Sequence, residues 1–431
     1  MRYVSTRGAA PAVSLRTALF DGPAPDGGLY MPERIDPLPP AWVAARRGAP
    51  LAGTADGVLG PFVGGELDPQ ALTALLRDAL DFPIPLVAIE DGVWALELFH
   101  GPTLAFKDVA ARVMARLMRA FHPAGDPLTI LVATSGDTGS AVAHAFAGLP
   151  GTRVVILYPR GQVSPIQEAQ LTTCETGRVD ALAVDGTFDD CQRLVKEAFA
   201  DRALRADVPL TSANSINIGR LLPQIVPYFH AAGQLPPGAA PIVCSTPSGN
   251  FGHLTAGLMA KRLGLPVERF VAATNVNDAV PQYLDSGRFE PRASVRTIAN
   301  AMDVGHPSNF ERMRALYHDD LAAMRRDVFG SRHDDEAVRG AIRAVHRRTG
   351  YLLDPHAAIG YLGLRQALDR YPGASGIVMA TAHPAKFADV VEPVIGEPVP
   401  VPARLAVCLA RPKRVTPIPA RFAVLAERLR A

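Results

Sequence analysis

Short runs of apolar, largely β-branched residues alternate with amphipathic stretches from about residue 94 onward. The runs are LTILVAT (128–134), TRVVILY (152–158), ALAVDG (181–186), APIVCST (240–246), RFVAAT (269–274) and GIVMAT (376–381). Helical patterns follow at 138–147, 189–204, 218–232 and 254–263. Near-continuous apolar strands alternating with helices predict an α/β protein whose parallel sheets are covered on both faces.

The first part of the chain has a different composition. It is rich in Pro and Gly and carries one clear helical pattern, at Pro69 to Leu80. We therefore expect a small N-terminal domain over 1–92, followed by α/β domains over 93–235 and 236–431. Residues 311–349 are charged and helical, which is typical of a solvated surface, and the basic tail ends in an amphipathic helix.

Composition narrows the choice of partners. The 431 residues carry a formal net charge of +2, so nothing favours nucleic acid or an anionic membrane. The four cysteines form no CxxC pair, no apolar run approaches the roughly 20 residues of a membrane span, and the N-terminus lacks an apolar signal region. These features predict a soluble, cytoplasmic protein. Nucleotide-binding, zinc-hydrolase and serine-hydrolase motifs are absent from the sequence.

One lysine stands out among five. Lys107 lies in ELFHGPTLAFKDV, flanked by apolar residues just after a Pro-containing turn. Desolvation there would lower its pKa and free the amine as a nucleophile or base, although a lysine near a helix start can also point to water. Lys386, in TAHPAKFADV, also follows a strand end, and local sequence does not decide between the two.

Small polar loops follow two of the apolar runs. SGDTG (Ser135, Gly136, Asp137, Thr138 and Gly139) and SGNFG (248–252) both open helices. Their small residues let the backbone approach a ligand, and a helix N-terminus offers unpaired N–H donors to an anion. Either loop alone could be an ordinary strand-to-helix turn; two in one chain favour anion binding.

Two further cationic positions follow strand-like segments. NSINIGR brings Asn214, Ser215 and Arg220 together near a helix start, a combination that suits a phosphate dianion. Simple N-capping by Asn or Ser is the alternative. Arg160, in YPRG, is a second cation at a strand end.

Read together, these segments resemble the threonine synthase family of the bacterial and fungal type. The matching strings include HGPTLAFKD, ATSGDTGSAVAHAF, NSINIGRLLPQI, PSGNFGHLTAGL, ANAMDVGHPSN, DPHAAIGY and ATAHPAKF, and they run in the family's order. The resemblance covers nearly the whole chain. It implies a fold-type II pyridoxal phosphate enzyme with two open α/β domains and the cofactor between them.

The resemblance also implies residue roles. Lys107 is expected to carry pyridoxal 5'-phosphate and act as the catalytic base. The resemblance thus assigns the cofactor to Lys107 rather than to Lys386. Thr381 is expected to face the pyridine nitrogen. The cofactor phosphate is expected at Gly249, Asn250, Phe251 and Gly252, beside His253, a position that is often Asp in the family. The substrate carboxylate is expected at 135–138, and its phosphate at Asn214, Ser215 and Arg220, with Arg160 as a further substrate-binding cation.

The implied reaction converts O-phospho-L-homoserine and water to L-threonine and phosphate, by β,γ elimination of phosphate followed by addition of water. The expected protein is a monomer or homodimer. Two alternatives stay open at this stage. One is a fold-type II dehydratase or sulfhydrylase, whose substrates would not call for a second phosphate site. The other is a non-catalytic binder of phosphorylated metabolites, against which the intact Lys107 argues.

Overall fold

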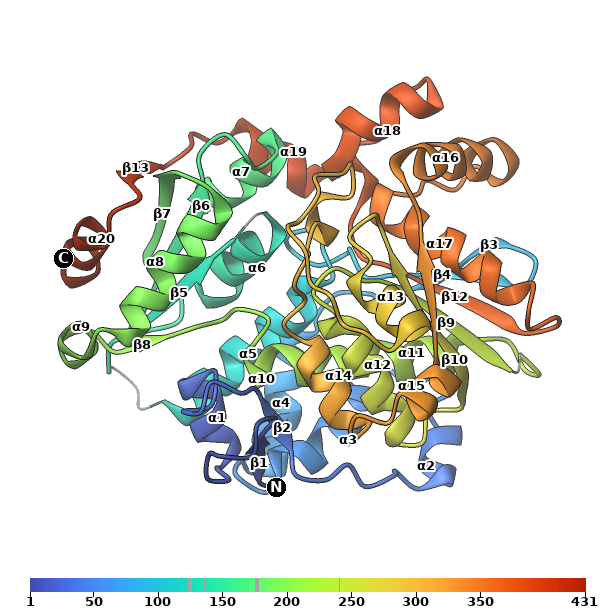
Figure 1. Cartoon of the computed structure of the whole chain (residues 1–431), viewed down its shortest axis with the longest axis horizontal. Helices are drawn as coiled ribbons and strands as arrows, with labels where there is room; N and C mark the ends of the chain where they lie inside the picture. The colour runs from blue at the N-terminus through green and yellow to red at the C-terminus, as the bar shows by residue number, and fades with distance from the viewer. Residues whose placement is uncertain (123–125, 135, 175–177, 240) are drawn as a thin grey trace.

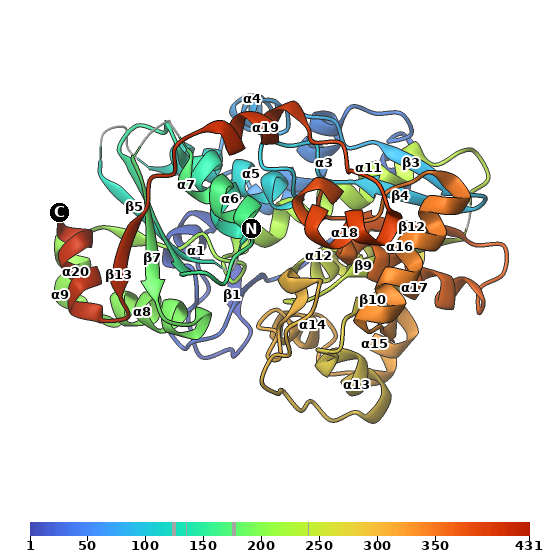
Figure 2. The same cartoon turned by 90° about the horizontal axis from the view of Figure 1, so that it is seen from above.

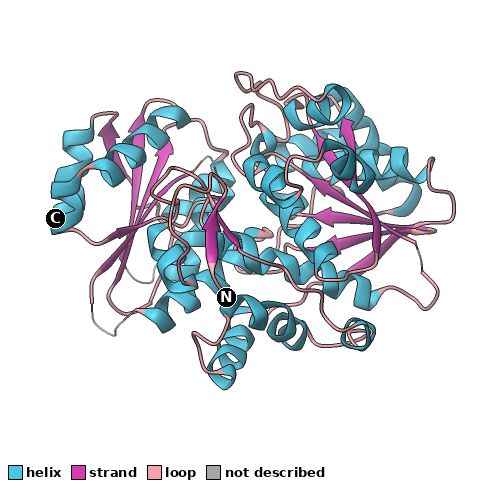
Figure 3. Ribbon diagram, turned by 60° about the horizontal axis from the view of Figure 1, so that its bottom comes forward, coloured by secondary structure: helices cyan, strands magenta, loops and turns pink. Residues whose placement is uncertain are grey.

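Two sheets, one parallel and one mainly parallel, lie side by side in the computed structural model, and the N-terminal segment lies below them in the view of Figure 1 (Figures 1 and 3). The structure describes residues 1–122, 126–134, 136–174, 178–239 and 241–431. Alternate residues of the strands face opposite layers of helices, so each sheet is buried on both faces, as its apolar strands predict.

The N-terminal segment is built from one small antiparallel ladder and four helices. Its elements are β1 (Tyr3–Ser5), α1 (Leu15–Asp21), β2 (Tyr30–Pro32), α2 (Pro40–Ala44), α3 (Leu51–Val63) and α4 (Pro69–Ala79). The predicted helix at Pro69 is confirmed as α4, and Asp68 caps it by accepting from the N–H groups of Gln70 and Ala71. The prediction missed α3 because its three glycines and Pro61 mask the helical pattern.

The first sheet has five strands in the order β13-β7-β6-β5-β8, all paired in parallel. Its strands are β5 (Leu128–Ala133), β6 (Thr152–Pro159), β7 (Arg178–Asp185), β8 (Leu210–Thr211) and β13 (Thr416–Pro419). The helices around it are α5 (Lys107–Phe121), α6 (Asp137–Phe146), α7 (Pro165–Thr172), α8 (Phe188–Ala200) and α9 (Arg202–Asp207). The helix predicted over 189–204 is therefore two helices, because Asp201 ends α8 and caps α9.

The second sheet has six strands in the order β11-β10-β9-β12-β4-β3. Only the β3–β4 pair at its edge is antiparallel. Its strands are β3 (Leu86–Glu90), β4 (Val93–Glu97), β9 (Ile242–Pro247), β10 (Val267–Thr274), β11 (Val328–Arg332) and β12 (Ser375–Ala380). Its helices are α12 (Gly252–Arg262), α13 (Ala279–Ser286), η2 (Asn300–Met302), α14 (Phe310–Leu316), α15 (Leu321–Asp327), α16 (Asp335–Thr349), α17 (Pro355–Leu368), η3 (Pro384–Phe387) and α18 (Ala388–Ile395).

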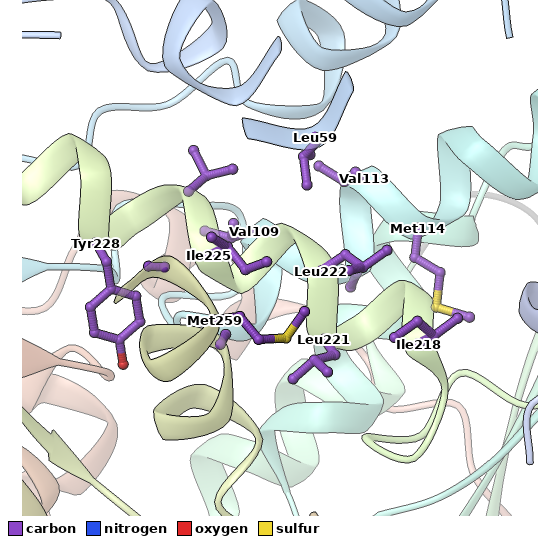
Figure 4. Close-up of a cluster of buried hydrophobic side chains, with 14 of the residues drawn as sticks. Leu59, Val109, Val113, Met114, Ile218, Leu221, Leu222, Ile225, Tyr228 and Met259 are labelled. Carbon is purple, nitrogen blue, oxygen red and sulfur yellow. The ribbon is translucent and has the colours of Figure 1, made fainter. Parts of the chain in front are cut away.

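A shared core joins the two sheets. The helix predicted over 218–232 is a succession of α10 (Ile218–Leu221), η1 (Leu222–Ile225) and α11 (Val226–Gln234), in which Pro223 and Pro227 occupy first-turn positions. Figure 4 shows Leu221, Leu222 and Ile225 from this segment packed between Val109 of α5 and Met259 of α12. The segments that follow the strands of the two sheets thus share one buried layer of apolar side chains.

The C-terminal segment leaves the second sheet and returns to the first. After α18 the chain forms α19 (Ala403–Ala410), then β13 beside β7, then α20 (Phe422–Arg430) against α8, as Figure 2 shows in red. The boundaries 1–92, 93–235 and 236–431 stay a prediction, but the sheets exchange strands across them. Strands β3 and β4 belong to the second sheet, and β13 belongs to the first.

The described part of the chain contains no helix long and apolar enough to cross a membrane. Within the same residues, no group of three or more His, Cys, Asp or Glu side chains could hold a metal ion. The expectation that 311–349 is a solvated helical surface is wrong in two places. It includes the edge strand β11, and Arg312 on α14 is completely buried.

Candidate active site

A cleft of about 1590 Å³ opens where strands of both sheets end. Residues that directly follow β5, β9 and β12 line it, namely Thr134, Ser248 and Thr381. In open parallel sheets, ligands bind outside the carboxyl ends of the strands. The cleft therefore lies where the fold predicts a ligand.

Lys107 is the first residue of α5 and lines this cleft. Two backbone bonds fix the preceding segment to the end of β12, from Phe106 N to Thr381 O at 2.8 Å and from His383 N to Leu104 O at 3.1 Å. Burial lowers the pKa of Lys107 from 10.5 to about 8; Arg220 and Lys386 add to the lowering and Asp137 opposes it. The unprotonated amine is thus far more abundant near neutral pH than it is for a solvent-exposed lysine.

Lys386, the other candidate for the cofactor lysine, has different neighbours. It is completely buried, its ammonium lies 2.7 Å from Oδ1 of Asp137, and it donates to Thr103 O at 2.9 Å. Burial alone would raise the pKa of Asp137, but Lys386, and then Lys107, hold it well below its usual range. The Lys386 side chain is therefore held by the loop that carries Asp137 and by Thr103.

The loop between β9 and α12 has the features of a phosphate cradle. No side chain caps the N-terminus of α12, so its first N–H groups remain available to an anion. A Cβ on Gly249 would lie 2.7 Å from Cα of Met302, so only glycine fits there. Phe251 adopts a left-handed backbone with φ of 60°, which turns the chain into the helix.

His253 follows this loop and differs from the rest of it. Its ring is buried between Phe106 and Tyr228, each with its centroid 5.0 Å away. Neither ring nitrogen has a hydrogen-bond partner, and burial lowers the pKa of His253 to about 3. The imidazole is therefore neutral and adds no charge beside the cradle.

The NSINIGR segment forms a tight turn followed by α10. Asn217 N donates to Asn214 O at 3.0 Å, and Asn250 Nδ2 donates to Ser215 Oγ at 2.6 Å. Arg220 is buried, donates through Nη1 to Ala213 O at 2.8 Å, and leaves Nε without a partner. Burial lowers the pKa of Arg220 to about 10, so it is cationic at neutral pH.

The structure brings most of the predicted site residues to one cleft. These are Lys107, Gly136, Asp137, Thr138, Asn214, Ser215, Arg220, Gly249, Asn250, Phe251, Gly252, His253 and Thr381. Ser135 lies outside the described residues. The structure does not bring Arg160 to the cleft lining with the others: its exposed side chain pairs with Asp185 at 3.2 Å. Strand β6 runs through Pro159 and carries Arg160 outward.

Sequence reasoning missed two buried residues at the cleft. His356 lines it, with Nδ1 donating to Asp354 Oδ2 at 2.6 Å and Nε2 accepting from Ala301 N at 3.3 Å. Gln167 donates to Asp137 Oδ1 at 3.2 Å. The contacts of His356 with Ala301 and of Gln167 with Asp137 join residues 55 and 30 positions apart, so no local pattern predicts them, although DPHAAIGY, which contains His356, is among the strings that resemble the family.

This donor set fits pyridoxal phosphate. The cofactor needs an amine with a lowered pKa, a cradle of backbone N–H groups for its phosphate, and a partner for its ring nitrogen. Lys107, the loop 249–252 and Thr381 offer these at one cleft. The separate loop around Arg220 leaves room for a second anionic group.

The comparisons with known proteins agree with this site. Residues 81–381 match the family described as pyridoxal-phosphate dependent enzyme. Residues 2–80 match the threonine synthase N terminus, and residues 357–427 match the threonine synthase C-terminal family. The fold and site thus define a fold-type II pyridoxal-phosphate-dependent enzyme.

Full-length relatives specify the family further. Threonine synthase of Escherichia coli K12 is 45% identical over 96% of this chain and 95% of its own length. The Escherichia coli crystal structure has a TM-score of 0.93 at 43% identity, and covers 100% of this chain and 99% of that one. Pyridoxal-phosphate-bound threonine synthase from Brucella melitensis also has a TM-score of 0.93, at 38% identity over 100% of this chain and 99% of its own. The chain belongs to the threonine synthase family.

Proposed function

We propose that this protein converts O-phospho-L-homoserine and water to L-threonine and phosphate. One observation carries the proposal. Lys107, whose pKa is lowered by burial to about 8, lines one cleft with two separate loops that hold unpartnered donors, the uncapped start of α12 at 249–252 and Arg220 at 214–220. A cofactor phosphate needs one such loop, and a phosphorylated substrate needs the second. Dehydratases and sulfhydrylases act on substrates without a phosphate and have no use for the second.

Pyridoxal phosphate, when bound, supplies an aldehyde for the substrate amine and a ring that withdraws electrons from its carbon chain. Thr381 offers a neutral hydroxyl to the ring nitrogen, and the backbone of 249–252 holds the phosphate. A neutral partner leaves the ring nitrogen largely unprotonated and moderates electron withdrawal.

Lys107 is the proposed base. Its desolvated amine takes a proton first from Cα and then from Cβ of the substrate, because one flexible side chain reaches both neighbouring atoms. Removal of the Cβ proton expels the phosphate on Cγ. Lys107 returns one proton to Cγ and one to Cα, the oxygen of water adds at Cβ, and the proton lost by that water leaves with the phosphate.

The loop 136–138 is proposed to orient the substrate carboxylate, with Ser135 as a further donor. Asp137 carries a negative charge in this loop, and Lys386 compensates it at 2.7 Å, so a second carboxylate can approach. Arg220, Asn214 and Ser215 are proposed to hold the substrate phosphate and to stabilise its departure through charge-assisted hydrogen bonds.

We further propose a cytoplasmic monomer or homodimer whose partners are small molecules rather than nucleic acid or membrane. The net charge of +2 supports the absence of a polyanionic partner.

The test is a product assay. The purified holoenzyme is incubated with O-phospho-L-homoserine, and L-threonine and phosphate are quantified in equal amounts. Lys107→Ala should retain the fold and form neither product. Release of a 2-oxo acid and ammonia instead, or turnover of unphosphorylated L-serine at a comparable kcat/KM, would contradict the proposal.

A further inference from the structure

Arg312 is a completely buried cation without a carboxylate partner. It lies on α14, has no exposed surface, and forms no ion pair among the described residues. Its guanidinium donates to four uncharged acceptors, namely Tyr30 O at 3.2 Å, Ser215 O at 3.3 Å, Asn309 Oδ1 at 2.8 Å and Ile216 O at 2.7 Å. A buried charge is costly unless something compensates it.

Two of these acceptors belong to the turn at 214–217. Because a trans peptide points its N–H opposite to its C=O, holding Ser215 O against Arg312 directs the N–H of Ile216 away from Arg312. Ile216 lines the cleft. The next N–H, of Asn217, is used within the turn by Asn214 O at 3.0 Å. The N–H of Ile216 therefore points away from Arg312 and belongs to a residue that lines the cleft.

Arg312 and Arg220 together surround this turn with two buried positive charges. Arg220 also lacks an ion pair among the described residues, and its Nε has no hydrogen-bond partner. Burial lowers the pKa of Arg312 to about 9, so both groups are charged at neutral pH. Glu311 acts on Arg312 and Asp108 acts on Arg220 electrostatically, but neither forms an ion pair with it among the described residues. Two buried cations of this kind suit a ligand with two negative charges better than a ligand with one.

We propose that Arg312 is a positioning residue that selects the doubly charged form of the substrate phosphate. It contacts no substrate atom. It holds the carbonyls of Ser215 and Ile216 and so presents the N–H of Ile216 to the phosphate. Its positive charge also polarises these two peptides, which strengthens their interaction with a negative ligand. This inference rests on the proposed function, because it takes the loop 214–220 as the substrate phosphate site.

The test compares two tetrahedral anions of the same shape and different charge. Methylphosphonate, with its affinity referred to the dianion, and methanesulfonate, a monoanion, are titrated into holoenzyme by calorimetry at a pH at which Arg312 is still charged. Arg312→Met and Arg312→Gln should weaken methylphosphonate binding on the order of tenfold, as expected for one lost charge interaction through protein. Methanesulfonate should weaken by less than about threefold, since it gains half as much from the charge. Arg312→Lys should retain most of the preference.

Controls separate this role from a structural one. Arg269→Met removes another arginine that donates to a backbone carbonyl, at Arg325 O, outside the cleft, and should leave both affinities unchanged. Equal weakening of both anions in the neutral variants would show that Arg312 only maintains the fold. Unchanged binding of both would also overturn the proposal. If Arg312→Met does not fold, Arg312→Gln against Arg312→Lys gives the same comparison.

The two proposals can fail separately. Anion titration does not require turnover, so wild-type enzyme that prefers the dianion but leaves O-phospho-L-homoserine unchanged contradicts only the proposed function. Wild-type enzyme that turns over this substrate while the neutral Arg312 variants keep their full preference for the dianion contradicts only the role of Arg312.

Discussion

The ammonium of Lys386 lies 2.7 Å from Oδ1 of Asp137, and both side chains are buried. Asp137 is the first residue of α6, in the loop proposed to receive the substrate carboxylate. An unpaired carboxylate there would repel that substrate group. The pair thus makes an acidic residue compatible with an anion-binding loop, and it fixes Lys386 in a role that Lys107 cannot share.

Lys386→Met should destabilise the protein and raise KM together. Breaking a buried ion pair by removing one partner costs about 3–5 kcal/mol, because the remaining charge is left uncompensated. Urea unfolding gives the stability, and Lys386→Met combined with Asp137→Asn should recover most of it. Lys413→Met is the control, since its pair with Glu168 at 2.5 Å is partly exposed and should contribute less than about 1 kcal/mol.

The pH dependence of cofactor attachment should report the lowered pKa of Lys107. Only the unprotonated amine attacks the cofactor aldehyde, so the rate should rise with pH and level off above about 8 instead of above 10.5. Arg220→Met removes a neighbouring cation and should move the midpoint upward. Asp137→Asn removes an anion and should move it downward. The visible absorbance of bound cofactor measures the rate, and a wild-type midpoint near 10 would exclude the assigned environment.

Thr381→Val tests the hydroxyl proposed to face the ring nitrogen. Valine keeps the shape and loses the hydrogen bond, which contributes about 0.5–1.5 kcal/mol, so kcat should fall by no more than about tenfold. The absorption spectrum of the bound cofactor should change at the same time. Thr381→Ser keeps the hydroxyl and should resemble the wild type. An unaltered spectrum in the valine variant would place the hydroxyl elsewhere.

Arg220→Ala should impair binding of the substrate phosphate without affecting binding of the cofactor phosphate. Losing one charged partner costs about 1.5–3 kcal/mol, which corresponds to a fall in kcat/KM from about tenfold to above a hundredfold. Cofactor content should be unchanged, because the cofactor phosphate is assigned to 249–252. Arg160→Ala, an exposed arginine outside the cleft, should leave both quantities as they are. Loss of cofactor with normal kinetics in the remaining holoenzyme would reverse the two assignments.

The sequence predicted those parts of the fold that are encoded locally. The apolar runs that form β5, β6, β9, β10 and β12 are buried on both faces, so their composition alone identifies strands. Strand β11 was missed because VFGSR, at the edge of its sheet, contains a glycine and an arginine. Edge strands bury fewer side chains and therefore carry a weaker apolar signal.

The candidate site likewise contains residues that the sequence could predict and residues that it could not. The loops around Lys107, Gly249 and Arg220 could be found because chemically capable residues follow predicted strands. The partnership of Asp137 with Lys386 joins residues 249 positions apart, and no local pattern records it. Arg312 lay in a stretch whose charges suggested a solvated surface, and only the packing of α14 against the turn 214–217 reveals its burial.

The return of the C-terminal segment has a consequence for how the chain is made. Strand β12 lies between β9 and β4 and pairs with both, while β13 completes the order β13-β7-β6-β5-β8. A nascent chain therefore cannot complete the second sheet before residue 380 has left the ribosome, nor the first before residue 419. The protein therefore cannot be finished one domain after another during synthesis, because each sheet needs a strand that lies after residue 374.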